Sequence, residues 1–262
     1  MAGKNNKSNL QEITTKLYSI PVLREKREGF DLKKYIGTQY DVIGLSVPQQ
    51  LKAYKSGYSF SSLPLEKQLA IWNNVWKESD VFDVLSQCLD FLGENHKRFD
   101  AEALWKIVKH WVKKIDNWAN SDDLSSVYAY LMEREPELVY EQLLKWNSSK
   151  NPWERRASLV TMLLYCRRKK TALPVEKVIR LIEPRLDDEN YFVQKGVGWA
   201  LRDTGVVYPK QIHDFLLKHI TRIDPAAFTA AVEKIDPGFK SQLKALRSQR
   251  AKKTRASKKS QA

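Results

Sequence analysis

Apolar residues recur at spacings of three and four along most of the chain. This periodicity places them on one face of an α-helix, whereas a half-buried strand would alternate with a period of two. Prolines stand near the starts of several of these segments, where the first helical turn tolerates them, and the connections are short. The pattern therefore predicts an all-α protein in which neighbouring helices are antiparallel. The helical segments are expected at 8–20, 64–79, 79–93, 100–118, 124–135, 136–147, 152–170, 174–186, 190–207, 209–220 and 224–236.

The stretch HWVKKIDNWANSDDL (110–124) reads as part of one amphipathic helix with an aspartate in an unexpected place. Trp111, Ile115 and Trp118 fall at i, i+4 and i+7, so they would share one helix face. Asp116 lies one position off this stripe. We interpret Asp116 as a carboxylate at the edge of an apolar face, from which it can reach a neighbouring surface.

An internal repeat is visible when residues 151–164 are laid over residues 190–203, an offset of 39 (190 − 151). A helix-pair unit of about 40 residues is the period of HEAT-type repeats, which stack into a solenoid with a concave binding face. Two copies are fewer than such arrays normally contain, and coincidence is the alternative. The matched pairs are Asn151 with Asn190, Trp153 with Phe192, and Arg156 with Lys195.

The net charge of the chain suggests a binding partner of opposite charge. Lysine and arginine total 45 against 31 aspartates and glutamates, a net charge of +14. Nine basic residues and no acidic one lie from Lys240 onward, which leaves +5 (14 − 9) for the body. We expect a polyanion partner, most simply nucleic acid, although a tail that only improves solubility is the alternative. The expected organisation is a flexible N-terminus (1–9), a helical-repeat domain (10–240) and a disordered basic tail (247–262).

Several classes of chemistry leave no signature in the chain. It contains no Walker or Rossmann glycine pattern, no GxSxG, no HExxH and no C-x-x-C, so we expect neither a metal nor a cofactor. Its two cysteines do not indicate a disulfide framework. The first 20 residues contain no apolar core of signal-peptide length, and no 18-residue apolar run occurs in the sequence. We therefore expect a soluble, cytoplasmic protein without a membrane partner.

Tryptophans beside cations are the remaining chemical feature. Cations neutralise phosphates and aromatic rings contact bases or sugars, so this combination is typical of nucleic-acid binding. A helix with its aromatic residues turned inward and its charges outward is the alternative for each cluster. The clusters are Trp111 with Lys113 and Lys114, Trp153 with Arg155 and Arg156, and Trp199 with Lys195 and Arg202.

Four blocks of sequence together carry a resemblance to one known family. They are YIGTQYDVIGLSVPQQLK (35–52), IDNWANSDDL (115–124), NPWERRAS (151–158) and YFVQKGVGWALRD (191–203). In order and spacing they resemble the AlkD-like family of DNA alkylation repair glycosylases, over residues 10–235. The resemblance implies an all-α, HEAT-like helical-repeat solenoid whose concave, positively charged face holds alkylated double-stranded DNA. A monomer is the expected state, because a solenoid clamp needs no second subunit.

The resemblance also implies an activity and its residues. The activity is hydrolysis of the N-glycosidic bond of cationic N3- and N7-alkylated purines, without flipping of the base. Asp116 matches the family's catalytic aspartate, Arg156 an arginine beside the lesion, and Trp199 a tryptophan near the damaged nucleotide. Tyr35 falls at a lesion-facing aromatic position. The further residues expected to contact the lesion or DNA are Trp111, Lys113, Lys114, Trp118, Trp153, Arg155, Lys195 and Arg202.

Three positions depart from the family's pattern. Val112 stands where a catalytic member has a second lesion-facing tryptophan, and Trp111 or Trp118 would have to replace it. Gln49 and Gln50 replace an arginine-rich pair. Some members bind branched DNA without efficient catalysis, so a binding protein of that kind is the alternative function.

An aspartate suits the implied chemistry. A purine alkylated at N3 or N7 already carries positive charge, so it can leave without a general acid. A fixed carboxylate can stabilise the oxocarbenium ion that forms on the sugar and orient the attacking water. We see no evidence for a lysine Schiff base and expect a monofunctional, nucleoid-associated glycosylase without lyase activity. The alternatives are that Asp116 pairs with an arginine such as Arg156, and that the chain is a protein scaffold with no nucleic-acid role.

Overall fold

The computed structural model describes residues 2–23, 29–169 and 173–259. Within these ranges the chain is almost wholly helical, and its only strand-like feature is one isolated bridge between Asp41 and Val81. The predicted all-α class is therefore confirmed. The chain divides into two compact units, Met1–Pro136 and Glu137–Ala262, each with its own apolar core.

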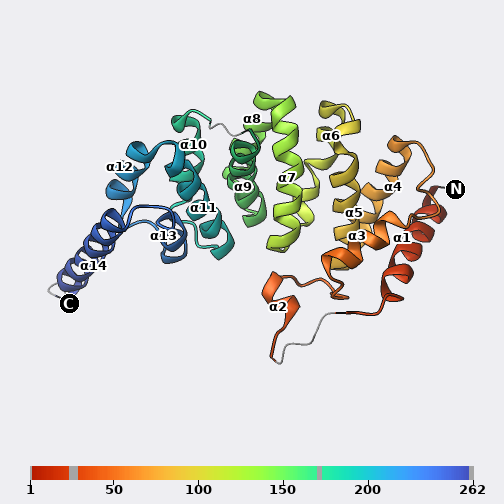
Figure 1. Cartoon of the computed structure of the whole chain (residues 1–262), viewed down its shortest axis with the longest axis horizontal. Helices are drawn as coiled ribbons and strands as arrows, with labels where there is room; N and C mark the ends of the chain where they lie inside the picture. Colours follow the sequence, from red (N-terminus) through yellow and green to blue (C-terminus); the bar gives the residue numbers. More distant parts are fainter. Residues whose placement is uncertain (1, 24–28, 170–172, 260–262) are drawn as a thin grey trace. The chain divides into compact units, whose positions relative to one another are not determined.

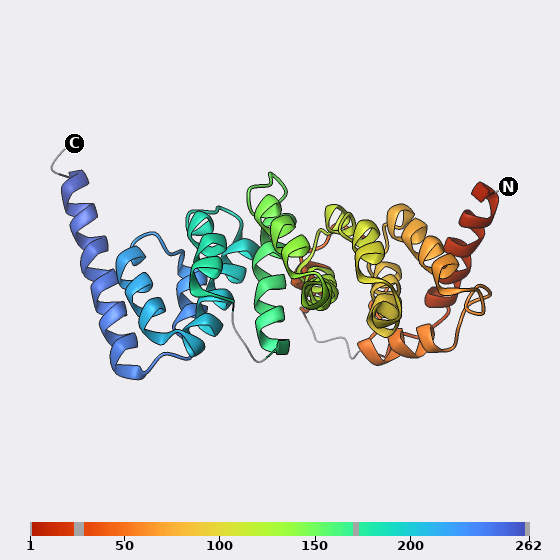
Figure 2. The ribbon, with the colours of Figure 1, turned by 90° about the horizontal axis from the view of Figure 1, so that it is seen from above.

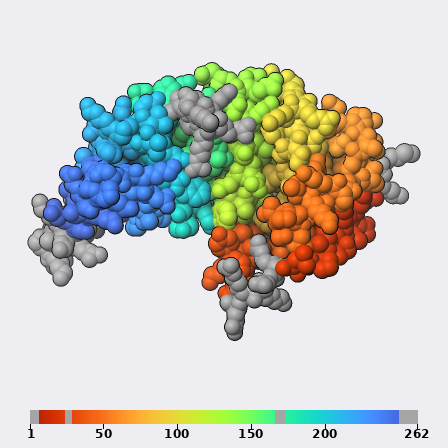
Figure 3. Space-filling model, viewed as in Figure 1, coloured from red at the N-terminus to blue at the C-terminus, as the bar shows by residue number. Residues whose placement is uncertain are grey.

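In the N-terminal unit the odd-numbered helices form a row. α3 packs on α5 and α5 packs on α7, while α4 and α6 pack against this row (Figures 1 and 2). α2 is short and lies on the surface of the unit (Figure 3). The elements are α1 (Ala2–Tyr18), α2 (Leu32–Ile36), α3 (Val47–Lys55), α4 (Leu65–Glu78), α5 (Phe82–Asn95), the 3₁₀ helix η1 (His96–Arg98), α6 (Ala101–Val108), the 3₁₀ helix η2 (Trp111–Lys114) and α7 (Trp118–Arg134).

The C-terminal unit repeats this arrangement. α11 packs between α9 and α13, and both α10 and α12 pack against α11. Helices of alternate number therefore lie side by side in each unit, as stacked helix pairs do. The elements are α8 (Pro136–Asn147), α9 (Pro152–Lys169), α10 (Val175–Ile182), the 3₁₀ helix η3 (Glu183–Arg185), α11 (Tyr191–Val207), α12 (Pro209–His219), α13 (Pro225–Ala231) and α14 (Pro237–Lys259).

The two segments related by 39 residues begin their helices in the same way. The Asn151 side chain accepts a hydrogen bond from the amide of Trp153 (2.9 Å), and Asn190 accepts one from the amide of Phe192 (3.0 Å). These contacts satisfy amides that have no partner inside the helix. The rings of Trp153 and Phe192 then meet with centroids 5.2 Å apart. The matched positions therefore contact each other where α9 packs on α11.

The expected continuous helix over 100–118 is wrong. α6 ends at Val108, whose carbonyl accepts a hydrogen bond from the Tyr128 hydroxyl (2.7 Å), and η2 and an extended Ile115 follow. α7 begins only at Trp118, because the Asn117 side chain caps the amide of Asn120 (2.9 Å). Asp116 therefore lies in the connection between two helices and not at the edge of a helix face.

Glycine permits a close approach of α11 to α13. A Cβ atom on Gly198 would lie 2.5 Å from the Ala227 carbonyl oxygen and 2.9 Å from the Ala230 Cβ. We expect Gly198→Ala to lower the free energy of unfolding by about 1–3 kcal/mol, because backbone must move to admit the methyl group. Urea denaturation measures this change. Gly93→Ala is the control, since nothing lies within 4 Å of that Cβ and helix propensity favours alanine there. Equal stability of the two variants would contradict the close approach.

Stability should also depend on pH through Asp90 on α5. Burial, and then repulsion from Asp123, raise the pKa of Asp90 from 3.8 to about 6. A carboxyl whose pKa is raised on folding contributes stability below pH 4 that is lost as pH rises through 6. We expect Asp90→Asn to be more stable than wild type by about 1 kcal/mol at pH 8, a value discounted for partial exposure. The difference should shrink at pH 5 in urea denaturation; a difference independent of pH would contradict it.

Both predicted flexible ends overlap helices. α1 begins at Ala2 and α14 ends at Lys259, whereas residues 1 and 260–262 lie outside the described ranges. The flexibility of 1–9, the extent of the domain over 10–240 and the disorder of 247–262 stay predictions. No helix in the described part of the chain is both long and apolar enough to span a membrane.

Candidate active site

The turn after α2 brings distant residues to Asp116. Gly37 ends α2 with φ of 76°, a left-handed conformation that glycine adopts without strain. The amides of Gly37 and Thr38 both donate to the carbonyl of Lys33 (3.0 and 3.2 Å). This cap turns the chain so that Thr38 and Gln39 face the connection between η2 and α7.

Three groups hold the Asp116 carboxylate. The Thr38 hydroxyl lies 2.7 Å from Oδ1 and 2.8 Å from Oδ2, the amide of Gln39 donates to Oδ2 (2.7 Å), and the Asn117 Nδ2 donates to Oδ1 (2.9 Å). Asp116 itself is partly exposed. No arginine or lysine stands among its partners in the described part of its own unit. The structure thus presents a carboxylate of fixed orientation at the surface.

An aromatic pair lies beside this carboxylate. Trp118, two residues after Asp116, contacts Tyr35 edge-on with ring centroids 5.6 Å apart, and its Nε1 donates to the Tyr35 carbonyl (3.0 Å). Tyr35 is 58% exposed, and its ring also contacts Phe30. These contacts bring the predicted residues Asp116, Tyr35 and Trp118 to one surface of the N-terminal unit.

Trp111 and Val112 are not on this surface. Both are buried, and the Trp111 ring stacks on Trp76 with centroids 4.6 Å apart. The Trp111 Nε1 donates to the Asn73 side chain (2.9 Å). Of the two tryptophans proposed to replace the one missing at position 112, Trp118 is therefore partly exposed and Trp111 is buried. Contact of Trp111 with DNA has no support from this placement.

Lysines line a cavity of about 650 Å³ next to η2. Lys113 is exposed, whereas Lys114 pairs with Asp80 (3.0 Å) and lies over the ring of Tyr40. The Tyr40 hydroxyl donates to the Lys114 carbonyl (2.7 Å), and burial, followed by Asp116 and Asp80, raises the Tyr40 pKa to about 12. Burial and then neighbouring lysines lower the pKa of His110, which also lines the cavity. Lys113 is thus the predicted cation that remains available here for a phosphate.

In the C-terminal unit, two predicted cations converge on Trp199. The Arg156 guanidinium lies 5.1 Å from the centroid of the Trp199 ring and the Lys195 ammonium 5.8 Å. Arg156 is only 1% exposed, and its Nη1 donates to the Phe192 carbonyl (2.6 Å). Its side chain is therefore held against the ring, with Lys195 as the more exposed cation.

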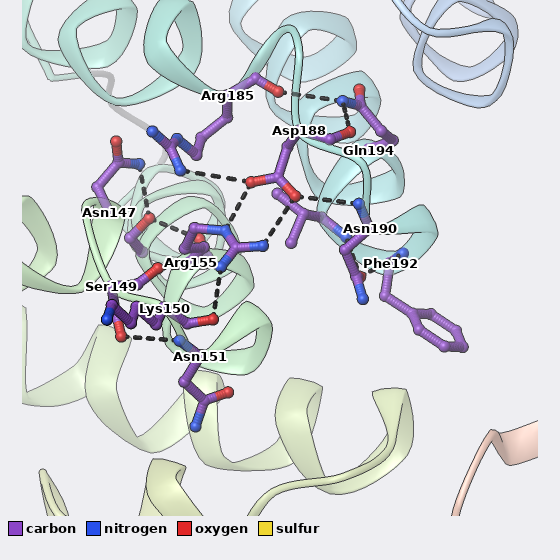
Figure 4. Close-up of polar contacts among 12 residues, drawn as sticks. Asn147, Ser149, Lys150, Asn151, Arg155, Arg185, Asp188, Asn190, Phe192 and Gln194 are labelled. Atoms are coloured by element: carbon purple, nitrogen blue, oxygen red, sulfur yellow. Dashed lines mark hydrogen bonds and ion pairs between the residues drawn. The ribbon is translucent and has the colours of Figure 1, made fainter.

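Arg155 instead forms an ion pair and hydrogen bonds within the C-terminal unit. Its Nε and Nη2 donate to the two carboxylate oxygens of Asp188 (2.6 and 3.0 Å), and its Nη1 donates to the carbonyls of Ser149 and Lys150 (2.9 Å each). Figure 4 shows this network joining the start of α9 to the turn before α11. The guanidinium thus donates its hydrogen bonds to groups of the protein itself. Its predicted contact with DNA has no support from this geometry.

The last two predicted residues, Trp153 and Arg202, also contact other residues of the protein. Trp153 is partly buried against Phe192. Arg202 donates to Asp203 (2.8 Å) and to Glu233 (2.5 Å), two carboxylates that compete with any phosphate. Their contact with DNA stays a prediction.

Thr38, Gln39 and Asn117 were not predicted as site residues. A glycine directly after a short apolar run is a helix-stop signal, so Gly37 could have indicated a turn there. An asparagine before an apolar run is likewise a helix-start signal, which would have placed Asn117 at a cap. No local pattern links Thr38 to a residue 78 positions away.

The chain is similar to known helical-repeat proteins. The family model described as "DNA alkylation repair enzyme" matches residues 23–235, and the chain belongs to this family. Its fold is similar to that of a predicted DNA alkylation repair enzyme from Enterococcus faecalis (TM-score 0.64, 15% identity, covering 84% of this chain and 100% of that one).

Two structures from Streptococcus mutans are also similar. For AlkD2 the TM-score is 0.53, with 20% identity over 88% of this chain and 99% of that one. For smu.31 from strain UA159 the TM-score is 0.53, with 21% identity over 72% of this chain and 93% of that one. No curated protein matches. The predicted AlkD-like helical-repeat fold is therefore confirmed, and family membership implies DNA binding and a role in DNA repair.

Proposed function

We propose that this protein is a monofunctional DNA glycosylase that removes N3- and N7-alkylated purines from double-stranded DNA. The observation that carries the proposal is the Asp116 carboxylate, fixed by Thr38, Gln39 and Asn117 at a surface that also exposes Tyr35. Membership of the DNA alkylation repair family supports DNA as the partner.

The chemistry needs little beyond a fixed negative charge. An alkylated purine leaves as a neutral base, so the chain needs no acid to protonate it. Positive charge develops on the sugar, and a preorganised carboxylate stabilises it without having to reorient. Removing one such stabilising group typically costs about 3 kcal/mol in the barrier. Asp116 has the charge and the fixed orientation for this role.

Aromatic rings give the cationic base a favourable surface. Tyr35 and Trp118 hold each other edge-on, so the faces of both rings have defined directions. A cation over such a face gains about 0.5–2 kcal/mol. In the C-terminal unit we assign Trp199, with Arg156 and Lys195 beside it, to contact with the DNA near the lesion. Lys113 adds a phosphate contact.

The second candidate is a non-catalytic protein that binds branched or distorted DNA. Val112 favours it, because that residue is buried where a catalytic member has a lesion-facing tryptophan. The placement of Trp118 two residues after Asp116 supports the glycosylase instead, since a partly exposed tryptophan is supplied from another position.

Release of free base distinguishes the two functions. Duplex DNA carrying N7-methylguanine and N3-methyladenine is incubated with the protein, and liberated bases are separated and quantified. The glycosylase requires release together with intact strands, because no lyase activity is expected. Tight binding to junction DNA without release would establish the second candidate, and binding that does not weaken with salt would contradict both.

A further inference from the structure

The hold on Asp116 depends on one nearly buried hydroxyl. Thr38 is 3% exposed, and its Oγ1 lies almost equally far from the two carboxylate oxygens (2.7 and 2.8 Å). The same Oγ1 accepts a hydrogen bond from the amide of Tyr40 (3.1 Å), which fixes the position of the oxygen. The hydroxyl therefore stands between the tight turn at Gly37 and the carboxylate.

We infer that Thr38 is a positioning residue: its hydroxyl, together with the amide of Gln39, fixes the Asp116 carboxylate in the orientation that base release requires. The inference rests on the proposed function, because it assigns Asp116 a role in the reaction. Thr38 itself is not assigned any contact with the reacting atoms.

A count of donors supports the inference. An ionised carboxylate offers about four acceptor positions. Thr38, Gln39 and Asn117 supply three donor hydrogens to the two oxygens of Asp116, so about one position remains for a water or for the developing sugar cation. The protein thus fixes the carboxylate and still leaves about one of its acceptor positions open.

Without these donors the carboxylate would lose its direction. Asp116 lies in the connection before α7, where no helix backbone restrains it, and Asn117 reaches only Oδ1. Loss of the Thr38 hydroxyl removes the only donor among the described residues that lies close to both oxygens. A displacement of about 1 Å at a reacting centre can cost on the order of a hundredfold in rate.

The segment that carries Thr38 has other anchors, so a change at this side chain is specific. The Tyr35 carbonyl accepts from Trp118, and the Tyr40 hydroxyl donates to the Lys114 carbonyl. Further along, Asp83 accepts hydrogen bonds from the amides of residues 43–45. Removing the hydroxyl therefore leaves the segment in place and alters mainly the hold on Asp116.

The test compares Thr38→Val, which keeps the shape but lacks the hydroxyl, with Thr38→Ser, which keeps the hydroxyl. Thr14→Val is the matched control, since the Thr14 hydroxyl donates to the carbonyl of Leu10 within α1 of the same unit, far along the chain from Asp116. For each variant the rate constant for release of N7-methylguanine is measured with enzyme in excess, together with the Kd for undamaged duplex. Hydrogen exchange of the Gln39 amide reports the hold on Asp116 without reference to activity.

We expect Thr38→Val to release base roughly ten- to a hundredfold more slowly, with the Kd within about twofold of wild type. Thr38→Ser and Thr14→Val should both stay within about threefold of wild type in rate. The Gln39 amide should exchange faster in Thr38→Val alone.

Three results would overturn the inference: a wild-type rate in Thr38→Val, an equally slow Thr38→Ser, or unchanged exchange of the Gln39 amide in Thr38→Val. Wild-type protein that releases no base would refute the proposed function and with it the role in base release. Faster Gln39 exchange in Thr38→Val would then still show that Thr38 holds the carboxylate.

Discussion

Asp116→Asn is expected to lower the rate constant for release of N7-methylguanine at least about a hundredfold. The substitution removes the negative charge that would stabilise the oxocarbenium ion, and it keeps the size of the side chain. Affinity for undamaged duplex should change little, because a carboxylate does not contribute to phosphate binding. Single-turnover release and a DNA titration at fixed salt measure the two quantities.

Asp116→Asn needs a control, because the substitution also changes the hydrogen bonds of this side chain. An asparagine must place an NH₂ group at one of the two oxygen positions, and at Oδ2 it would face the amide of Gln39, so that two donors meet. Asp116→Asn can therefore disturb residues 38–40 as well as remove charge. A hydrogen-exchange measurement on the Gln39 amide separates the two effects. Release at the wild-type rate by Asp116→Asn would refute the catalytic assignment.

Asp188→Asn is expected to lower the free energy of unfolding by about 3 kcal/mol. The Asp188 side chain is 4% exposed and accepts from both Arg155 and Arg185. Removing the charge leaves the Arg155 guanidinium, itself only 15% exposed, beside a group that cannot neutralise it. Urea denaturation monitored by tryptophan fluorescence measures the loss.

The adjacent residue provides the control. Asp187 also pairs with an arginine, Arg222, but its side chain is 62% exposed. An exposed pair of this kind contributes about 0–1 kcal/mol, so Asp187→Asn should have a small effect. Equal losses in the two variants would show that burial does not determine the strength of the Arg155–Asp188 pair.

Much of the fold could be predicted because its determinants are local. Apolar spacing and prolines at helix starts correctly indicated the helices from α4 to α13, apart from the segment around η2, whereas α14 was not predicted. The offset of 39 residues also has a local cause, since Asn151 and Asn190 cap their helices alike. These signals are readable in sequence because each concerns residues within one or two turns.

The site was less accessible because its contacts are distant in sequence. Trp111 and Trp118 satisfy the same helical spacing, yet one is buried against Trp76 and the other lies beside Tyr35. Spacing alone could not distinguish them, because the helix breaks between the two residues. Arg155 and Arg156 are similarly adjacent, but only Arg156 lies over the Trp199 ring. In each case tertiary packing decides which neighbour is available to a ligand.

The bond between Thr38 and Asp116 changes how an alignment of this family should be read. The aspartate also accepts hydrogen bonds from the turn after Gly37, and these contribute to folding whether or not the protein is catalytic. Conservation of this aspartate among homologues would therefore not by itself identify an active enzyme. A more informative signature is a pair of positions: an aspartate retained while its threonine or serine partner has been replaced by an apolar residue would mark lineages released from selection for base release.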